Sequence, residues 1–386
     1  MSKRRAAGSG ALLKWRKDGQ VVGWIGVADL GVVDGKRCRQ KVYGKTQAEV
    51  QKRLADILHK KEDGTLPKPG RLTVEAWLKT WLAGVHKRPR TFEHYELVVR
   101  KHIVPLIGSK PLAKLTASDV ERLMAAKLAG GLSPRSVHHV RAVLRNALRK
   151  AVRDRLISHN VAAEADAPDV PMVEMQTLTP EQVKVFLGAV TGRRLEALYV
   201  TTLALGLRRG EVLGLRWSDI NLDAGTLRVS RALQWIRPIG QRRSEPALVE
   251  PKSRTSRRAL SLPSVALESL RAHRRRWADE KLRLGDRYLN EWDLVFVGPQ
   301  GEPLNPKTIW SEFHEEILVG AGLPLIRFHD LRHSCASLLL LAGVPARMVQ
   351  EILGHSSIGL TLGTYSHVLP GLREQAVRAQ NAMLGG

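Results

Sequence analysis

Residues 205–220 read LGLRRGEVLGLRWSDI, and this stretch is the starting point for interpreting the chain. Arg208 follows a glycine by two positions and directly precedes a stretch with helical character. An arginine at such a place is also an ordinary surface cation. The pattern therefore predicts chemistry only if other stretches of the chain supply partners for it.

Three further patterns follow in order. EPKSRTSRRALSLP (250–263) puts Lys252 in the turn of an expected β-hairpin. HDLRHSCASLLLLAGVP (329–345) places His329 and Arg332 three apart, on one helical face. VQEILGHSSIGLTLGTYSHV (349–368) carries His355 and Tyr365. Singly each is weak, because a loop lysine, a half-buried histidine, a residue following a helix C-cap and a half-buried tyrosine explain them too.

The bulk composition points to a polyanionic partner. The chain has 386 residues, enough for two or three domains, and a formal net charge of +25. Such an excess of Lys and Arg is typical of proteins that bind nucleic acid or an anionic membrane. No apolar run is long enough to span a bilayer, so we expect no membrane partner and favour nucleic acid. Two cysteines form no disulfide framework, which indicates a cytoplasmic protein with reduced thiols.

Residues 1–65 are expected to form a first domain, a three-stranded sheet followed by a helix. Turn signals at 18–19 and 34–35 separate apolar stretches, and Thr46 with Glu49 has the spacing of a capping box. The expected sheet carries the cations Lys14, Arg16, Arg37 and Arg39. A small basic sheet suits a module that reads a DNA groove, and the alternative is a solvated sheet face.

Residues 71–160 are expected to form a second, helical domain. Ser133 and Pro134 give a cap and a first-turn proline for a helix whose apolar side begins at Val137. Beside that apolar side runs a ladder of four arginines at i+4 spacing: Arg141, Arg145, Arg149 and Arg153. Like charges at this spacing destabilise a helix, and an adjacent phosphate backbone would reverse the penalty. We therefore expect this ladder to contact DNA.

Residues 161–177 are expected to be a linker, because they are acidic and broken by prolines. Residues 178–386 then form a third, mostly helical domain that opens with a capping box at Thr179 and holds a β-like stretch over 226–262. The fold class expected for the whole chain is mainly α with small β elements.

In combination and in this order, the four patterns are very specific. The last domain resembles the tyrosine recombinases, also called the phage integrase family, over residues 179–370. The helical segment is similar to the core-binding domain of that family, and the N-terminal unit looks like the arm-type DNA-binding domain of integrases. The resemblance implies six catalytic residues: Arg208, Lys252, His329, Arg332, His355 and Tyr365. Leu205 and Ser253 depart from the family's usual threonines without replacing an active group.

The chemistry implied is transfer of a DNA phosphodiester to Tyr365 through a 3′-phosphotyrosine intermediate. A phenol is a poor nucleophile until its proton is removed, and it also leaves readily, so the bond is reversible without ATP. Arg208 and Arg332 suit the charged transition state, with His355 as a third donor. Lys252 suits the general acid for the 5′-oxygen. His329 is assigned to the tyrosine proton, with a donor role to phosphate as the alternative. We expect no metal and no other cofactor, since no metal-ligand spacing occurs.

The same resemblance implies the partners. They are double-stranded DNA at core and arm sites, a homotetramer acting through a Holliday junction, and an accessory directionality factor, in the cytoplasm of a bacterial host at its nucleoid. Residues 371–386 form an expected tail helix, which either packs on its own domain or docks on a neighbouring subunit. The alternatives for the whole protein are a type IB topoisomerase-like relaxase and a chromosome-dimer resolving recombinase. A DNA-binding regulator with a decayed site is disfavoured, because all six positions are filled.

Overall fold

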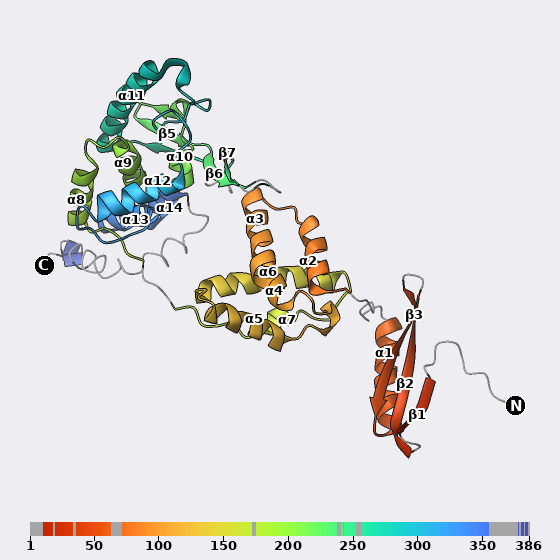
Figure 1. The fold of residues 1–386 in the computed structure, drawn as a ribbon. Coiled ribbons are helices and arrows are strands. Elements are labelled where there is room, and N and C mark those ends of the chain that lie inside the picture. Colours follow the sequence, from red (N-terminus) through yellow and green to blue (C-terminus); the bar gives the residue numbers. More distant parts are fainter. Residues whose placement is uncertain are drawn as a thin grey trace. The chain divides into compact units, whose positions relative to one another are not determined.

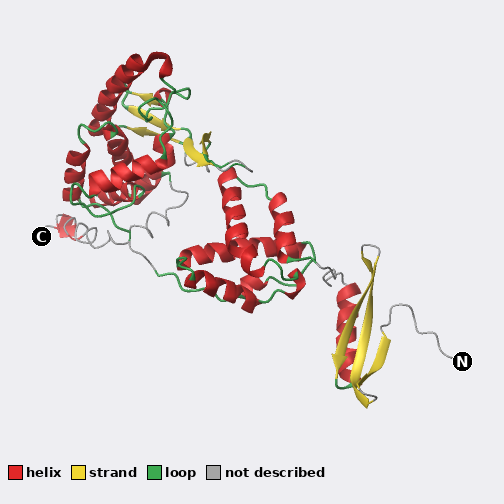
Figure 2. Cartoon of the chain, viewed as in Figure 1, coloured by secondary structure: helices red, strands yellow, loops and turns green. Residues whose placement is uncertain are grey.

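The structure is a computed structural model, and it describes residues 11–17, 20–33, 36–62, 72–171, 175–237, 241, 243–251, 257–354, 377, 380, 381, 383 and 384. The contacts divide the chain into two units, with the boundary between Pro171 and Met172. Figure 1 labels the elements along the chain, and Figure 2 shows that helices dominate, with small sheets in the N-terminal part and in the second unit. The expected fold class, mainly α with small β elements, is confirmed.

The N-terminal part is a three-stranded antiparallel sheet covered by one helix, as predicted. Its elements are β1 (Ala11–Lys17), β2 (Gln20–Val33), β3 (Lys36–Gly44) and α1 (Gln47–Glu62), with strand order β1-β2-β3. Helix α1 buries Leu54 and Ile57 against Ala28 of β2. Thr46 caps the helix, because its hydroxyl accepts the Glu49 N–H at 3.2 Å, while the Glu49 carboxylate reaches back to the Lys45 N–H.

The helical part after residue 72 has its own core. Its elements are α2 (Val74–Ala83), α3 (Pro89–Val98), the π-helical turn η1 (Val99–Ile103), α4 (Val104–Ile107), η2 (Leu112–Lys114), α5 (Ala117–Ala129), α6 (Pro134–Arg153) and α7 (Val161–Glu164). Helix α6 contacts α2, α3, α5 and α7 (Figure 1). It begins where the sequence predicts, since Ser133 accepts the Ser136 N–H and Pro134 occupies the first turn.

The helical core continues beyond residue 160, where the sequence predicts a linker. Asn160 caps the short helix α7 by accepting the Ala162 N–H at 3.2 Å, and its Nδ2 donates to the Arg145 carbonyl of α6 at 2.9 Å. Val161, Ala162 and Ala165 are buried in the same core as α6. Small apolar residues in an acidic, proline-rich sequence are thus enough to dock this segment.

The second unit combines helices with short strands. Its elements are α8 (Pro180–Val190), α9 (Glu196–Leu205), α10 (Arg209–Leu213), η3 (Trp217–Asp219), β4 (Ile220–Asn221), β5 (Thr226–Val229), β6 (Ala232–Ile236), β7 (Glu245–Val249), β8 (Arg258–Ser261), α11 (Ser264–Leu284), η5 (Gly285–Arg287), α12 (Pro306–Ser311), the π-helical turn η6 (Glu312–Leu318), α13 (Asp330–Leu341) and α14 (Ala346–Leu353). The capping box predicted at Thr179 is present, with Gln182 as its partner.

The β-like stretch predicted over 226–262 contains two pairings. Strands β5 and β8 pair antiparallel, with Val229 opposite Arg258. Between them in sequence lies a second antiparallel pair, β6 with β7, which the sequence does not predict. Lys252 belongs to the connection from β7 to β8 and lies outside the described residues.

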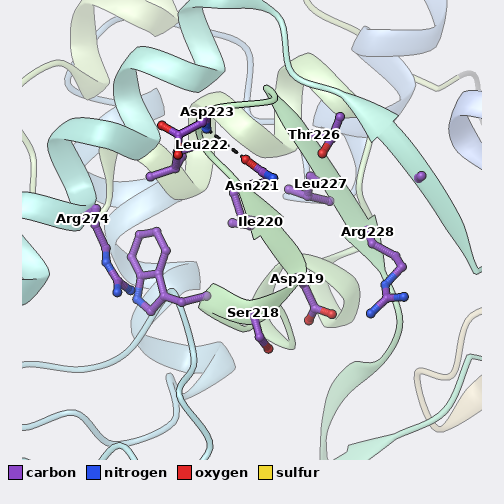
Figure 3. Close-up of a pocket in the computed structure, with 12 residues that line it drawn as sticks. Ser218, Asp219, Ile220, Asn221, Leu222, Asp223, Thr226, Leu227, Arg228 and Arg274 are labelled. Carbon is purple, nitrogen blue, oxygen red and sulfur yellow. Dashed lines mark hydrogen bonds between the residues drawn. The ribbon is translucent and has the colours of Figure 1, made fainter.

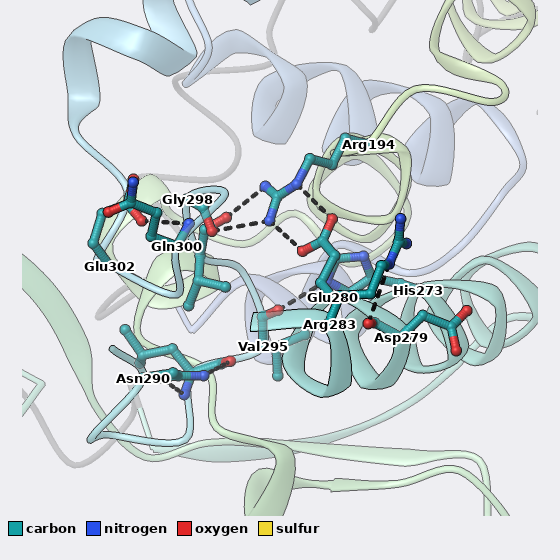
Figure 4. A network of polar contacts seen from close by, with 12 residues as sticks. Arg194, His273, Asp279, Glu280, Arg283, Asn290, Val295, Gly298, Gln300 and Glu302 are labelled. Carbon is teal, nitrogen blue, oxygen red and sulfur yellow. Dashed lines mark hydrogen bonds and ion pairs between the residues drawn. The ribbon is translucent and has the colours of Figure 1, made fainter. Parts of the chain in front are cut away.

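A polar network fixes the start of α9 against α11, at the edge of the second unit's core. The Arg194 guanidinium makes a two-pronged contact with Glu280 of α11, at 2.8 and 2.7 Å, and also donates to the carbonyls of Val297 and Gly298 (Figure 4). Two turns earlier on α11, His273 contacts the Val295 carbonyl at 2.8 Å. These bonds anchor the helix that ends at Gly206, next to the predicted site.

Candidate active site

Arg208 lies between two helices whose geometry holds its backbone. Helix α9 ends in Gly206, which has a left-handed conformation (φ 60°), and Arg208 is the N-cap of α10. A Cβ at Gly206 would come within 2.4 Å of a Leu353 methyl carbon, so the close approach of α14 requires glycine here. The Arg208 side chain, about a third exposed, donates to Glu211 at 2.5 Å and to the Gly354 carbonyl at 3.1 Å.

Glu211 is the buried anion under Arg208. One carboxylate oxygen accepts the Arg208 guanidinium, and the other accepts the Arg208 backbone N–H at 3.0 Å. Burial alone would raise the pKa of Glu211, but Arg258 and Arg208 outweigh it, so the pKa lies below its ordinary value. Glu211 is therefore a carboxylate at neutral pH that orients its neighbours.

Arg332 is the most deeply buried of the predicted catalytic residues that the structure describes. It lies on α13 with 1% of its surface exposed. Its two terminal nitrogens donate to the Gly206 carbonyl and to the Leu353 carbonyl, each at 2.7 Å. Because Arg208 donates to the next carbonyl, that of Gly354, the structure brings these two arginines to adjacent residues of one turn.

His329 stands one turn before Arg332 and is the N-cap of α13. Its ring lies 5.0 Å from the His333 ring at a near-perpendicular angle. Crowding by protein atoms, followed by the nearby His333 and Arg332, lowers the pKa of His329 to about 4, although the residue keeps an exposed edge. Its imidazole is therefore neutral at pH 7 and able to accept a proton.

Lys252, His355 and Tyr365 lie outside the described residues, which include Pro251 directly before Lys252 and Gly354 directly before His355. Gly354, directly before His355, is the left-handed C-cap of α14 (φ 66°), the helix end that the sequence offers as an alternative explanation of this stretch. Arg208 and Arg332 thus hold the turn that directly precedes His355 in the sequence.

Arg258 is a residue of this cluster that the sequence does not single out. It is the first residue of β8, and 7% of its side chain is exposed. Its Nε donates to the Ile352 carbonyl at 2.6 Å, and an Nη contacts Glu211 at 3.2 Å. The one signal in the sequence is the pair Arg257–Arg258 in an expected strand, where alternation turns one of two neighbours inward.

A hollow elsewhere in the second unit contains none of the predicted catalytic residues. It is lined by η3, β4 and β5, with Arg228, Asp219 and Arg274 among its polar side chains (Figure 3). The Arg274 guanidinium lies 4.4 Å from the Trp217 ring centroid and 4.6 Å from that of Trp277. This arrangement holds α11 against η3.

The cations predicted to bind DNA occupy two separate parts of the chain. On α6, Arg145, Arg149 and Arg153 are exposed, whereas Arg141 is partly buried and donates to the Ala163 carbonyl at 3.1 Å. The ladder is thus three exposed guanidiniums and one structural one.

On the N-terminal sheet, Arg16 and Arg39 are exposed, and the Lys14 ammonium lies 5.9 Å from the Trp24 ring. The Arg37 backbone pairs with Val32 in the β2–β3 ladder, and its side chain is outside the description.

Two features of the described residues bear on other classes of protein. No group of three or more His, Cys, Asp or Glu side chains could hold a metal ion within the described ranges. None of the helices in those ranges is long and apolar enough to cross a membrane.

Comparison with known proteins agrees with this arrangement. Residues 176–371 match the model of the phage integrase family, and residues 73–128 match the N-terminal SAM-like domain of phage integrases. The chain belongs to the phage integrase family. Its members are tyrosine recombinases, enzymes that cleave and rejoin DNA, so this protein is a site-specific DNA recombinase. Neither the relaxase nor the chromosome-dimer alternative is favoured.

Relatives match this recombinase along almost its whole length. A tyrosine recombinase XerC-like protein of Caldanaerobacter subterraneus subsp. tengcongensis is 30% identical over 364 residues, covering 90% of this chain and 93% of that protein. An integrase of Streptomyces ambofaciens is 33% identical over 373 residues, covering 95% and 94%.

Solved structures share the fold of this recombinase. The Tn1549 transposon integrase in complex with a circular intermediate DNA has a TM-score of 0.65 at 20% identity, covering 80% of this chain and 99% of that one. A lambda integrase tetramer bound to a Holliday junction has a TM-score of 0.55 at 17% identity, covering 94% and 96%.

Proposed function

We propose that this recombinase is the integrase of a phage or other mobile element and that Tyr365 is its nucleophile. In the cleavage step the Tyr365 oxygen bonds to the scissile phosphorus, and the bond from phosphorus to the 5′-oxygen breaks. His329 takes the phenol proton, and Lys252 gives a proton to the departing oxygen. Attack by a 5′-hydroxyl of the partner strand on the 3′-phosphotyrosine reverses these steps and yields a Holliday junction.

Arg208, Arg332 and His355 are the proposed donors to the scissile phosphate. The observation that carries this assignment is that Arg208 and Arg332, from different elements, donate to the adjacent carbonyls of Gly354 and Leu353. Both guanidiniums are therefore fixed beside the residue that leads into His355 before any substrate arrives. Preorganised donors of this kind stabilise the charge that gathers on phosphate oxygens.

The Arg208 guanidinium has capacity left for a phosphate. Each terminal nitrogen of an arginine carries two N–H bonds, and each of those in Arg208 makes one contact within the described part of the chain, to Glu211 or Gly354. The side chain is also partly exposed, unlike that of Arg332. Arg208 is thus the more accessible of the two arginines to a phosphate from solution. Arg332 donates to the same phosphate oxygens from a buried position.

His329 suits the proton transfer because its ring is neutral. Because its pKa is about 4, the imidazole is neutral at physiological pH and has one unprotonated ring nitrogen. A neutral imidazole can accept the phenol proton, and its remaining N–H can still donate to a phosphate oxygen, so the lowered pKa is consistent with both roles.

The DNA contacts proposed outside the catalytic site come from two surfaces. Arg145, Arg149 and Arg153 on α6 bind the backbone of the core site, and the N-terminal sheet with Arg16 and Arg39 binds arm sites. Support for the second surface comes from exposed Trp15 and Tyr43, whose rings meet at 5.4 Å on that sheet and suit a nucleic-acid contact.

We further propose that the protein acts in the cytoplasm of a bacterial host as a homotetramer on DNA, with an accessory directionality factor for excision. The tetramer is suggested by the lambda integrase structure of the same fold, which is bound to a Holliday junction. Bacterial and phage sources of the relatives suggest the host.

The proposed function is tested with core-site duplexes nicked next to the scissile phosphate. Cleavage then releases a short fragment that diffuses away and traps the protein on the DNA. The wild type should form a covalent adduct on denaturing gels in the presence of EDTA and without ATP. Tyr365→Phe should bind the same duplex with an unchanged Kd and form no adduct. An adduct from Tyr365→Phe, or adduct formation that EDTA abolishes, would contradict the proposal.

A further inference from the structure

Three consecutive carbonyls at the end of α14 each accept a hydrogen bond from a different arginine. The Ile352 carbonyl accepts Arg258 Nε at 2.6 Å, the Leu353 carbonyl accepts Arg332 at 2.7 Å, and the Gly354 carbonyl accepts Arg208 at 3.1 Å. Carbonyls in the last turn of a helix have no partner inside the helix. Here they dock the end of α14 on β8, α13 and the start of α10 at once.

Two of these arginines are proposed to bind the scissile phosphate, and the third, Arg258, is placed differently. Its side chain is 7% exposed, and it bonds only protein groups in the contacts described. Its Nη contacts the Glu211 oxygen at 3.2 Å, while the other oxygen of Glu211 accepts Arg208 at 2.5 Å. A continuous chain of charge-assisted bonds therefore runs from Arg258 through Glu211 to Arg208.

Arg258 also joins two segments of the chain that carry predicted catalytic groups. It is the sixth residue after Lys252, and its backbone is fixed by pairing with Val229. Its Nε holds Ile352, three residues before His355. One side chain thus links the strand that follows the Lys252 segment, the carboxylate under Arg208 and the turn that leads to His355.

We propose that Arg258 is a positioning residue for DNA cleavage, which aligns Arg208 through Glu211 and the His355 turn through the Ile352 carbonyl. The inference rests on the proposed function, because it assigns a residue to that same site. Burial favours the neutral form of Arg258, and the Glu211 carboxylate opposes this, so the side chain remains a cation paired within the protein.

The geometry requires arginine rather than a cation in general. The Nε and Nη donors of a guanidinium diverge in one plane, and in Arg258 they meet acceptors on two different elements. A lysine offers a single nitrogen on a flexible stem and cannot hold both at once. Arg258→Lys therefore keeps the charge beside Glu211 and loses the alignment. Misplacement of catalytic groups by about 1 Å lowers a rate about 100-fold.

The test compares Arg258→Lys and Arg258→Met with wild type and with Arg283→Lys as a matched control. Arg283 is an exposed arginine of α11 whose Nε donates to the Asp279 carbonyl. Three quantities are measured on the full-length protein: the Kd for a nicked core duplex, the rate of adduct formation at saturating duplex, and the Tm. We expect Arg258→Lys to lower the saturated rate about 10- to 100-fold with a Kd within about threefold of wild type. Arg283→Lys should match the wild type in all three.

A substrate with sulfur in place of the bridging 5′-oxygen separates alignment from proton donation. A thiolate leaves without a general acid, so this substrate compensates for a defect at Lys252. It should not restore Arg258→Lys, whose defect lies in the guanidinium set and in the His355 turn. Full restoration, or an unchanged saturated rate with the normal substrate, would overturn the positioning role. A wild type that forms no adduct with either substrate would instead contradict the proposed function.

A double-mutant cycle tests the link through Glu211 without DNA. Arg258→Met, Glu211→Gln and the combined variant are compared by Tm and by denaturant unfolding. If the two side chains act as one unit, the combined variant should lose less stability than the two single losses together. Additive losses would overturn the proposed chain from Arg258 to Arg208, whatever the enzyme's activity.

Discussion

Arg332 donates to the Leu353 carbonyl at 2.7 Å, so an arginine of α13 holds the last turn of α14. Its other terminal nitrogen holds the Gly206 carbonyl at the end of α9. Arg332, which is proposed to bind phosphate, therefore also joins the three helices α9, α13 and α14 by hydrogen bonds. Arg332 therefore contributes to both catalysis and stability. Arg208, which is partly exposed, should contribute less to stability than Arg332 does.

Replacing each arginine by alanine should separate these two roles. Arg332→Ala leaves two carbonyls unpaired in a buried place, at a cost of about 1–3 kcal/mol each, and should lower the free energy of unfolding strongly. Arg208→Ala, at a partly exposed position, should lower it less. Both should reduce adduct formation about 100-fold or more. Urea unfolding and suicide-duplex kinetics measure the pair, and equal stability losses would contradict the distinction.

Gly206→Ala should be far more damaging than Gly192→Ala. Both glycines have positive φ, at 60° and 76°, so both substitutions carry the left-handed penalty of about 1–2 kcal/mol. Only at Gly206 would the new Cβ meet a neighbour, the Leu353 methyl at 2.4 Å, while a Cβ at Gly192 would meet nothing within 4 Å. Thermal unfolding should show the larger loss for Gly206→Ala, together with slower cleavage. Equal losses of stability for the two variants would contradict the close approach of Leu353 in α14 to Gly206.

The stability of the second unit should fall as the pH is lowered from about 6.5 to about 4. Burial lowers the pKa of His273 to about 4, and its ring contacts the Val295 carbonyl. The unfolded chain binds a proton at higher pH than the folded one, so unfolding is favoured progressively below the ordinary pKa of histidine. His273→Gln should make the curve of unfolding free energy against pH less steep in this range, leaving the part due to His329, whose pKa is also lowered to about 4. A curve as steep as that of wild type would show that His273 is not the group responsible.

The exposed arginines of α6 should set the salt dependence of DNA binding. Arg149→Gln should weaken binding to all sequences alike and reduce the slope of log K against log salt by about 1. Arg283→Gln removes the same charge from α11 and should leave the slope unchanged. Fluorescence anisotropy at several salt concentrations measures both. An unaltered slope for Arg149→Gln would remove α6 from the DNA interface.

Local signals in the sequence predict much of this fold, and tertiary contacts explain the rest. The starts of α6 at Ser133 and α8 at Thr179 follow from caps whose hydrogen bonds lie within four residues. The short helix α7 was not predicted, because its docking depends on Asn160 reaching α6. The pair β6–β7 was missed for a similar reason: nothing in its own sequence distinguishes it from an irregular connection.

The site shows the same division between local and distant information. Arg208, His329 and Arg332 are found from motifs in single stretches of sequence, and the structure brings the two arginines to neighbouring carbonyls. Arg258 could not be chosen over Arg257 by composition, since its role arises from contacts with Glu211 and Ile352, both far away in the chain. Tyr365, His355 and Lys252 stay predictions from the sequence, because they lie outside the described residues.

The most direct test of the central claim is mass spectrometry of the peptide that remains attached to DNA after cleavage of a suicide duplex. Trypsin digestion of the trapped complex, followed by nuclease treatment, should leave a nucleotide on the peptide that contains Tyr365, joined through a 3′-phosphate. A nucleotide on any other side chain, or a linkage through a 5′-phosphate, would contradict the account.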